Sequence, residues 1–297
     1  MLATRHPSLA IVIASTGRPC EIRQWKERLA VQTLPPDLMC LAVTGTDDLP
    51  SLDDWPVACE VIFSPRGLPV QRNAALDRLI DRVDIVAFFD DDYVASRTVV
   101  AEIVELFRAN VQLVAVSGKL LLDGIGGPGV PYDAALAAVQ AYECTKPDAI
   151  WLRPHPGGLY GCNMAYRASA IGDLRFDEQL PLYGWLEDVD FGCQMMGRGL
   201  IAYTNAFAGV HQGVKHGRTS GVRLGYSQVA NPIYLCRKGT LRRGAMIRLV
   251  VRNMAKNLIR TWLPEPWIDR AGRLKGNLIA VRDLIGGTLH PSRILNL

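Results

Sequence analysis

Short apolar runs alternate with amphipathic stretches along the first two thirds of the chain. Continuous apolar runs predict buried strands, and apolar positions that recur every three or four residues predict helices. On this pattern we expect strands at 9–15, 39–44, 59–63, 84–89 and 113–118, and helices at 21–32, 70–80 and 98–109. Strands that alternate with helices are typical of an α/β domain with a mostly parallel sheet flanked by helices. Four glycines and two prolines within 123–131 predict a mobile loop.

The last part of the chain has a different pattern. Four basic residues at a spacing of four predict a helix with a basic stripe on one side: Arg248, Arg252, Lys256 and Arg260. Apolar residues between them, ending with Trp262, form the other side. A basic amphipathic helix with tryptophan near its end is typical of helices in a membrane interface. A helix packed on the body, with its basic side in solvent, gives the same pattern.

Charge is distributed unevenly along the chain. Residues 237–297 contain 13 Lys and Arg and 3 Asp and Glu, a net charge of +10, whereas residues 1–236 contain 20 basic and 26 acidic residues, a net charge of −6. A basic tail on a slightly acidic body predicts contact with an anionic surface. The candidates are anionic lipid, a phosphorylated acceptor and nucleic acid. We expect no nucleic acid, because exposed aromatic residues do not alternate with the basic ones.

Composition places the 297-residue chain among ordinary globular proteins, with 49% hydrophobic and 21% charged residues. The seven cysteines are scattered without a CxxC pair, which suggests neither a zinc site nor a disulfide framework and is typical of reduced thiols in the cytosol. The apolar run 9–14 is too short for a signal-peptide core, and no apolar segment has the length of a membrane span. We therefore expect a cytoplasmic protein.

Two acidic clusters are the candidates for chemistry. Asp90, Asp91 and Asp92 follow the apolar run 85–89, and the carboxyl ends of strands are where α/β sheets bind ligands. Three adjacent carboxylates need a compensating cation, for which Mg²⁺ or Mn²⁺ is suited. A solvated acidic turn is the alternative. The second cluster, 187–190 (EDVD), follows an aromatic stretch that can desolvate a carboxylate into a base, and it also suits a helix N-terminus.

The order of several motifs resembles that of family 2 glycosyltransferases, the inverting enzymes of the GT-A fold, over about 9–215. The motifs are 15–19 (STGRP), 66–75 (RGLPVQRNAA), 90–92 (DDD), 161–167 (GCNMAYR), 176–178 (FDE), 184–191 (GWLEDVDF) and 208–211 (AGVH). The resemblance implies a Rossmann-like nucleotide-diphospho-sugar transferase fold, with a mixed, mostly parallel sheet and a basic helical extension. It also implies a single displacement in which an acceptor hydroxyl attacks the anomeric carbon as a nucleoside diphosphate leaves.

By this resemblance, specific residues acquire expected roles. Asp92 and Asp90 would hold the metal ion, with His211 as a further ligand or else a structural histidine. Asp188 would be the base, with Glu187 beside it, and Trp185 would stack on the acceptor sugar or form an aromatic plug. The donor would contact these residues: Thr16, Arg18, Asp47, Arg72, Asn73, Asp90, Asp91, Gly161 and Asn163. Of these, Arg72 is equally suited to pairing with the acidic cluster, and Asn163 to holding its loop.

Many family members place an acidic residue, which recognises the nucleobase, directly after the second strand. Here 43–46 (VTGT) precedes Asp47, so this part of the family pattern is not matched. UDP or dTDP is favoured. We expect a catalytic domain at 1–236, with a nucleotide-binding part to about 118 and an acceptor-binding part from about 119, and a basic extension at 237–297. The tail suggests a lipid-linked glycan acceptor at the inner face of the cytoplasmic membrane, with 241–262 on anionic lipid. The alternatives are a non-catalytic assembly scaffold and a nucleotidyltransferase that makes nucleotide sugars.

Overall fold

The structure, a computed structural model, describes residues 6–145, 149–155, 157–217 and 219–297. The strands are β1 (Leu9–Ala14), β2 (Leu38–Val43), β3 (Cys59–Phe63), β4 (Ile85–Phe89), β5 (Tyr93–Ala95), β6 (Leu113–Asp123), β7 (Leu152–Pro154), β8 (Asn163–Arg167) and β9 (Leu200–His211). The helices are α1 (Pro19–Ala30), α2 (Leu68–Leu79), α3 (Val99–Ala109), α4 (Tyr132–Cys144), α5 (Ala168–Ile171), α6 (Glu187–Met195), α7 (Gly221–Lys238), α8 (Arg243–Trp262) and α9 (Arg270–Ile285).

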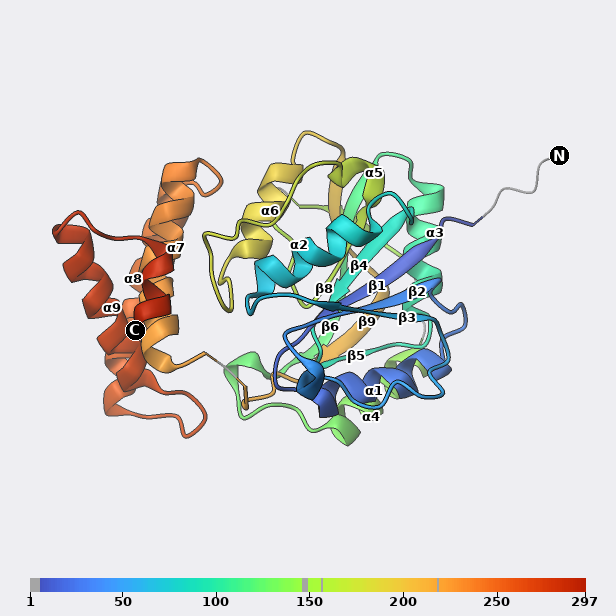
Figure 1. The fold of residues 1–297 in the computed structure, drawn as a ribbon, viewed down its shortest axis with the longest axis horizontal. Coiled ribbons are helices and arrows are strands. Elements are labelled where there is room, and N and C mark those ends of the chain that lie inside the picture. The colour runs from blue at the N-terminus through green and yellow to red at the C-terminus, as the bar shows by residue number, and fades with distance from the viewer. Residues whose placement is uncertain (1–5, 146–148, 156, 218) are drawn as a thin grey trace.

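One mixed sheet forms the centre of the body (Figure 1). Its strand order is β3-β2-β1-β4-β8-β6-β9-β5, and β7 pairs with β9. Among the described strands, β1, β2, β3, β4, β6 and β9 point one way, and β5, β7 and β8 run antiparallel to their neighbours. The predicted class, a mostly parallel sheet flanked by helices, is confirmed.

Alternation along the strands produces two apolar layers. In β1, Leu9, Ile11 and Ile13 pack on the face that α1 and α3 cover, and Ala10 and Val12 pack on the face that α2, α5 and α6 cover. This is the two-residue period of a strand that is buried on both faces. The continuous apolar runs in the sequence follow from it.

The topology fixes where the polar residues after the strands lie. Strand β1 lies between β2 and β4 and is parallel to both, with Ile13 opposite Phe89. The chain goes from β1 to β2 and β3 on one side and returns through α2 to β4 on the other side of β1. The crevice at such a switch point is the usual ligand site of an α/β sheet. Ser15 to Arg18 after β1 and Asp90 to Asp92 after β4 meet there.

The expected elements up to residue 118 are confirmed, with ends within two residues for all but β6. Strand β6 continues to Asp123, and the loop expected from there is anchored, since Gly124–Gly126 form a 3₁₀ turn and Val130 N–H donates to Gln212 O at 2.8 Å. Strands β5 and β7 are too short to show a period in the sequence. Polar residues interrupt β8 and β9, for example Thr204, whose hydroxyl donates to Trp151 O at 2.8 Å. Only tertiary contacts make such positions suitable for a buried strand.

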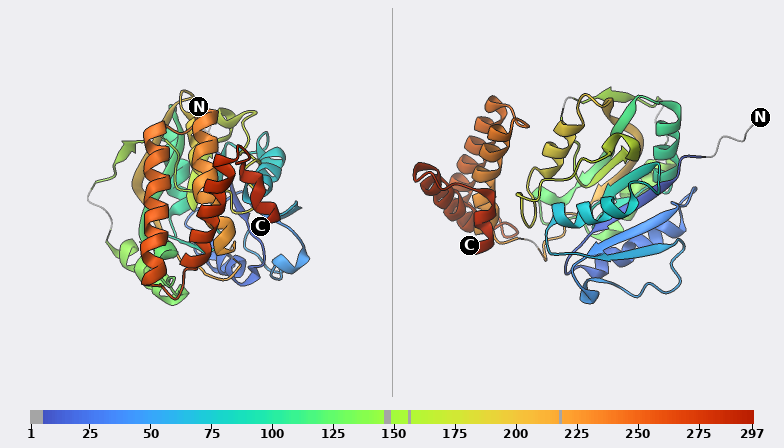
Figure 2. Two further views of the ribbon diagram at one scale, coloured as in Figure 1. Left: turned by 90° about the vertical axis from the view of Figure 1, so that its left-hand side faces the viewer. Right: turned by 45° about the horizontal axis from the view of Figure 1, so that its top comes forward.

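The helices α7, α8 and α9 pack on one another as a C-terminal helical unit at one end of the body (Figure 2). The unit begins at Gly221, so the division expected at 236/237 falls inside α7. Hydrogen bonds of α7 and its C-terminal turn hold it to the body, one of them from Asn231 Nδ2 to Trp185 O at 2.8 Å. Lys238 Nζ donates to Asp177 at 2.6 Å and to Asp190 at 2.7 Å, Tyr234 donates to Asp177, and Thr240 donates to Asp190.

Helix α8 turns a mixed apolar and basic face to solvent. Trp262 is 82% exposed, and the other exposed apolar residues of this face are Ile247, Val251, Leu258 and Ile259. Arg248, Arg252, Lys256 and Arg260 are also exposed. Helix α8 instead packs against the other helices of the unit through residues such as Val250 and Met254. Among the described helices, none is both long and apolar enough to cross a bilayer.

The junction predicts a dependence of stability on pH. Burial opposes ionisation of Asp177, but Lys238, the Gln179 N–H and Tyr234 hold the pKa of its carboxyl below the ordinary value. A carboxyl with a depressed pKa contributes stability that is complete above the ordinary pKa and lost as the pH falls through the lower, folded-state value. We expect α7 to lose hydrogen-exchange protection in that acidic range.

The variant Lys238→Met tests the same junction at neutral pH. It removes charged hydrogen bonds from two carboxylates, one of them fully buried, and should lower the free energy of unfolding by about 2 kcal/mol in urea titrations. Lys26→Met, which removes a single exposed hydrogen bond to Asp53 O, should change it by less than about 0.5 kcal/mol. Equal effects of the two variants would contradict a stabilising role of Lys238 at the junction.

Candidate active site

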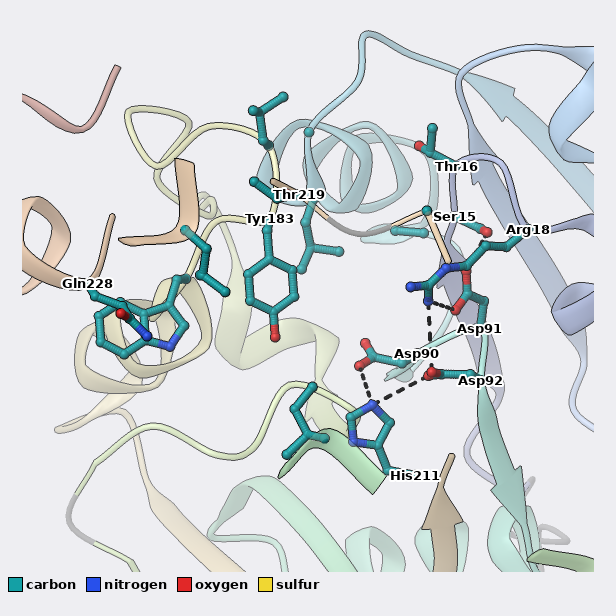
Figure 3. Close-up of a pocket in the computed structure, with 18 of the residues that line it drawn as sticks. Ser15, Thr16, Arg18, Asp90, Asp91, Asp92, Tyr183, His211, Thr219 and Gln228 are labelled. Carbon is teal, nitrogen blue, oxygen red and sulfur yellow. Dashed lines mark hydrogen bonds and ion pairs between the residues drawn. The ribbon is translucent and has the colours of Figure 1, made fainter. Parts of the chain in front are cut away.

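A cavity of about 360 Å³ opens at the switch point of the sheet. The body contributes residues from the segment after β1, the start of α2, the aspartates after β4 and the end of β9, and the C-terminal helical unit closes the other side. The predicted site residues that line it are Thr16, Arg18, Asp90, Asp91, Asp92, Trp185 and His211. The sequence motifs thus converge on one pocket (Figure 3).

Asp90, Asp92 and His211 form the most concentrated group of ligand atoms in this pocket. One ligand atom from each lies within 4.8 Å of the others, with His211 Nε2 3.4 Å from Asp92 Oδ1 and 3.6 Å from Asp90 Oδ2. Asp92 is 2% exposed, and its buried Oδ1 accepts no hydrogen bond from a described residue. The carboxylate oxygens suit Mg²⁺ or Mn²⁺, and the imidazole nitrogen adds a ligand that Mn²⁺ accepts more readily than Mg²⁺.

The histidine ring is oriented from behind by a residue that the sequence analysis missed. Asp123 Oδ1 lies 2.9 Å from His211 Nδ1, which directs Nε2 toward Asp90 and Asp92. Burial opposes a charged ring, but the hydrogen bond with Asp123 and the nearby carboxylates of Asp92 and Asp90 raise the pKa of His211 to about 10. These carboxylates therefore demand positive charge between them, whether from a protonated imidazole or from a metal ion.

The third aspartate of the triplet turns away from this group. Asp91 accepts hydrogen bonds from Ser15 Oγ at 2.5 Å and from Arg18 at 2.9 Å. The Arg18 guanidinium also donates to the carbonyl of His216 at 3.0 Å. Asp91 and Arg18 thereby connect the segment after β1 to the segment after β9, and Arg18 remains on the pocket wall.

Arg72 connects the two acidic clusters. Only 1% of it is exposed, and its guanidinium pairs with Glu187, lies 3.4 Å from Asp90 Oδ1 and donates to Gly161 O at 2.9 Å. The guanidinium carbon also lies 5.6 Å and 5.5 Å from the ring centroids of Phe88 and Phe176. Arg72 does not line the pocket, so the structure realises the pairing alternative of the sequence analysis.

The carboxylates at the start of α6 have different surroundings. Burial raises the pKa of Glu187 to about 8 against the opposing charge of Arg72. Asp188 is more exposed than Glu187, and it accepts hydrogen bonds from the N–H groups of Gly161 and Val189 at 2.8 Å each. Desolvation raises its pKa as well. Neither carboxylate lines the cavity itself.

Three further predicted donor contacts lie outside the pocket wall. Asn73 holds the segment before α6, donating to Phe176 O at 2.9 Å and to Glu178 at 2.8 Å. Asn163 is 1% exposed and accepts from Ser117 Oγ at 2.5 Å, in line with the loop-holding alternative. Asp47 is exposed. Its neighbour Asp48 instead accepts from Gly17 N–H at 2.5 Å.

The residues that the sequence did not reveal were missed for different reasons. Asp123 is the last residue of β6, in the part of the strand beyond 118 that the apolar pattern did not predict, and its place opposite His211 in the β6–β9 register puts it in the site. A carboxylate at the carboxyl end of a parallel strand was the available signal. Gln228 and Arg273 reach the pocket from α7 and α9, and no local pattern marks them.

Comparison with known proteins identifies the fold. No protein-family model and no curated protein sequence matches the chain. The solved mannosyltransferase PcManGT from Pyrobaculum calidifontis, in complex with GDP-Man and Mn²⁺, is similar with a TM-score of 0.56 at 15% identity, over 98% of this chain and 86% of that one. A mycobacterial protein gives 0.50 at 17% identity, over 78% and 75%, and TarS of S. aureus gives 0.44 at 14%, over 75% and 40%.

The similarity to the mannosyltransferase extends over nearly the whole chain. It therefore includes the C-terminal helical unit, beyond the range of about 9–215 covered by the sequence motifs. The predicted GT-A-like fold is confirmed, and the chain has the fold of a glycosyltransferase.

The connection through Arg72 is testable by substitution. Arg72→Met leaves Glu187 and Asp90 without their buried cation and should lower the free energy of unfolding by about 3–5 kcal/mol in urea titrations. Arg78 lies on the same helix with 63% of its side chain exposed, so Arg78→Met should cost less than about 1 kcal/mol. A loss below about 1 kcal/mol for Arg72→Met would contradict a structural role for this cation.

Proposed function

We propose that the protein is an inverting, metal-dependent glycosyltransferase that moves a sugar from a nucleoside-diphosphate sugar to a hydroxyl group of a glycan. The observation that carries the proposal is the group Asp90, Asp92 and His211, set at the switch point of a sheet with the fold of a mannosyltransferase solved with GDP-Man and Mn²⁺. Asp92 Oδ1, which lies 3.4 Å from His211 Nε2, accepts no hydrogen bond from a described residue and is therefore available as a metal ligand.

In this reaction the chain must hold a diphosphate and accept a proton. Asp90, Asp92 and His211 would hold Mg²⁺ or Mn²⁺, which supplies Lewis acidity and charge neutralisation to the leaving diphosphate. Thr16 and Arg18 border the part of the pocket next to this group and are suited to contacts with the nucleotide. Trp185 offers an apolar surface for the acceptor sugar.

Asp188 is the better candidate for the base. Glu187 is committed to Arg72, whereas Asp188 has a raised pKa and forms no ion pair with a described residue, which strengthens it as a proton acceptor. The acceptor oxygen forms a bond to the anomeric carbon and gives its proton to Asp188. The bond from that carbon to the diphosphate breaks, and the diphosphate leaves with the electron pair. One displacement inverts the anomeric configuration.

We also propose that the acceptor is lipid-linked, as in cell-surface polysaccharide synthesis, and that the protein binds the inner face of the cytoplasmic membrane. The support is the exposed face of α8, which combines Trp262 and Ile259 with Arg248 and Arg252. Apolar residues beside basic ones suit an interface of anionic lipid, and the cytoplasmic leaflet carries such lipids.

Calorimetric titration of UDP, dTDP, GDP and CDP, with and without Mn²⁺, tests the donor site. UDP or dTDP is the expected ligand, bound at least about tenfold more tightly with Mn²⁺ than without it, because the metal neutralises the diphosphate among carboxylates. Asp92→Asn should abolish the metal-dependent part. If none of the four binds with Mn²⁺, the transferase proposal is wrong and the scaffold alternative gains.

Asp188→Asn separates catalysis from binding. Loss of the base should lower transfer by about 10²–10⁴-fold while nucleotide binding stays within about twofold of the unmodified protein. Glu178→Gln, which alters an exposed carboxylate near Asn73, serves as the control and should retain activity. Undiminished transfer by Asp188→Asn would exclude it as the base.

Vesicle sedimentation tests the membrane face. The double variant Arg248→Gln, Arg252→Gln should bind vesicles with 30% phosphatidylserine about tenfold or more weakly, since each basic residue near such a surface contributes about 1 kcal/mol. Arg23→Gln, an exposed site on α1, should bind as the unmodified protein does. Equal binding of the protein to neutral phosphatidylcholine vesicles would contradict the proposed role of charge.

A further inference from the structure

The pocket has a second wall, which none of the sequence motifs identified. Gln228 on α7, Asn253 and Lys256 on α8, and Arg273 on α9 line it. Figure 3 shows Gln228 on the opposite side of the pocket from Asp92 and His211. One wall therefore belongs to the body and the other to the C-terminal helical unit.

A buried network fixes the orientation of the Gln228 amide. Arg270 Nη1 donates to Asn257 Oδ1 at 3.1 Å, and because arginine can only donate, that Asn257 atom must be the oxygen. Asn257 Nδ2 then donates to Gln228 Oε1 and to Asn277 Oδ1, both at 2.8 Å. Asn277 Nδ2 in turn donates to Gly225 O at 2.6 Å. Gln228 thus turns its oxygen inward and keeps its NH₂ group for the pocket.

The charged side chains of this wall are all positive. Lys256 forms no ion pair with any described residue, and Arg273 adds a second guanidinium to that of Arg270, which is engaged by Glu265 at 2.5 Å. No carboxylate of the described helical unit lines the pocket. The Asn253 side-chain nitrogen is also buried without a partner among the described residues. The wall therefore presents hydrogen-bond donors and positive charge.

We infer that this wall, formed by Gln228, Asn253, Lys256 and Arg273, binds a phosphate or diphosphate group of the acceptor. The assignment to the acceptor rests on the proposed function. In a single displacement the acceptor approaches the anomeric carbon from the side opposite the leaving diphosphate, so its own anion cannot share the Asp90–Asp92–His211 side. Charge-assisted hydrogen bonds from donors in a partly enclosed pocket are suited to phosphate oxygens.

The surroundings favour a lipid as the carrier of this phosphate. Lys256 is the member of the basic stripe on α8 that lines the pocket, and Arg252 and Arg248 follow one and two turns away on the exposed face. The stripe therefore runs from the pocket along the exposed face of α8, where Ile247 and Val251 lie beside it. An acceptor anchored in a membrane would reach the pocket along that stripe.

Binding of farnesyl diphosphate and of inorganic pyrophosphate to the full chain tests the inference. Titrations contain EDTA, so that neither probe binds through a metal ion. Lys256→Met and Arg273→Met should each weaken farnesyl diphosphate binding about tenfold or more, the loss expected for a charge-assisted contact of about 1.4 kcal/mol. Lys275→Met, on α9 two residues from Arg273, exposed and outside the pocket, is the matched control and should bind normally.

The outcomes separate the claims. Tight binding of farnesyl diphosphate alone, lost in both pocket variants, supports a lipid-linked acceptor, and equal binding of pyrophosphate supports the same anion site with a water-soluble phosphate. Absence of binding by both probes, or equal loss in Lys275→Met, overturns the inference. Mn²⁺-dependent nucleotide binding by the same variants shows that they are folded, and its absence from the unmodified protein would count against the proposed function instead.

Discussion

Arg72 is a cation that the fold buries completely among carboxylates from two distant parts of the chain. It pairs with Glu187 at the start of α6 and lies beside Asp90 after β4, while Gly161 O accepts a third contact. Removing any of these charges from water is unfavourable unless the partners are in place. This side chain therefore holds the start of α6, with Asp188, close to the metal-binding candidates, while Lys238 and Thr240 hold the same helix through Asp190.

With that connection made, the pocket acquires two walls of opposite electrostatic character. The body contributes Asp90, Asp92 and His211, which require a cation, and the C-terminal helical unit contributes donors that require an anion. Lys238 holds the two parts together through Asp177 and Asp190. A metal–diphosphate on one side and a phosphorylated acceptor on the other would satisfy both walls, which explains why the basic helices are part of the pocket and not only a tail.

The sequence was informative wherever hydrophobic periodicity determined an element, or wherever the position of a residue after a strand determined its place in the site. Continuous apolar runs predicted β1 to β4, and their order placed Asp90 and Asp92 at the ligand edge of the sheet. It was uninformative where contacts between distant segments decide. An arginine at position 72 suits both phosphate binding and pairing with Glu187. Only its burial distinguishes the two roles. Asp123 and Gln228 enter the site through a strand extension and a helix whose packing no local pattern records.

The most direct test is a crystal structure of the protein with Mn²⁺ and UDP, in which manganese is located by anomalous scattering. We predict one strong anomalous peak among Asp90, Asp92 and His211, in contact with the diphosphate oxygens. A peak elsewhere in the pocket, or a nucleotide bound with no manganese at these three residues, would contradict it.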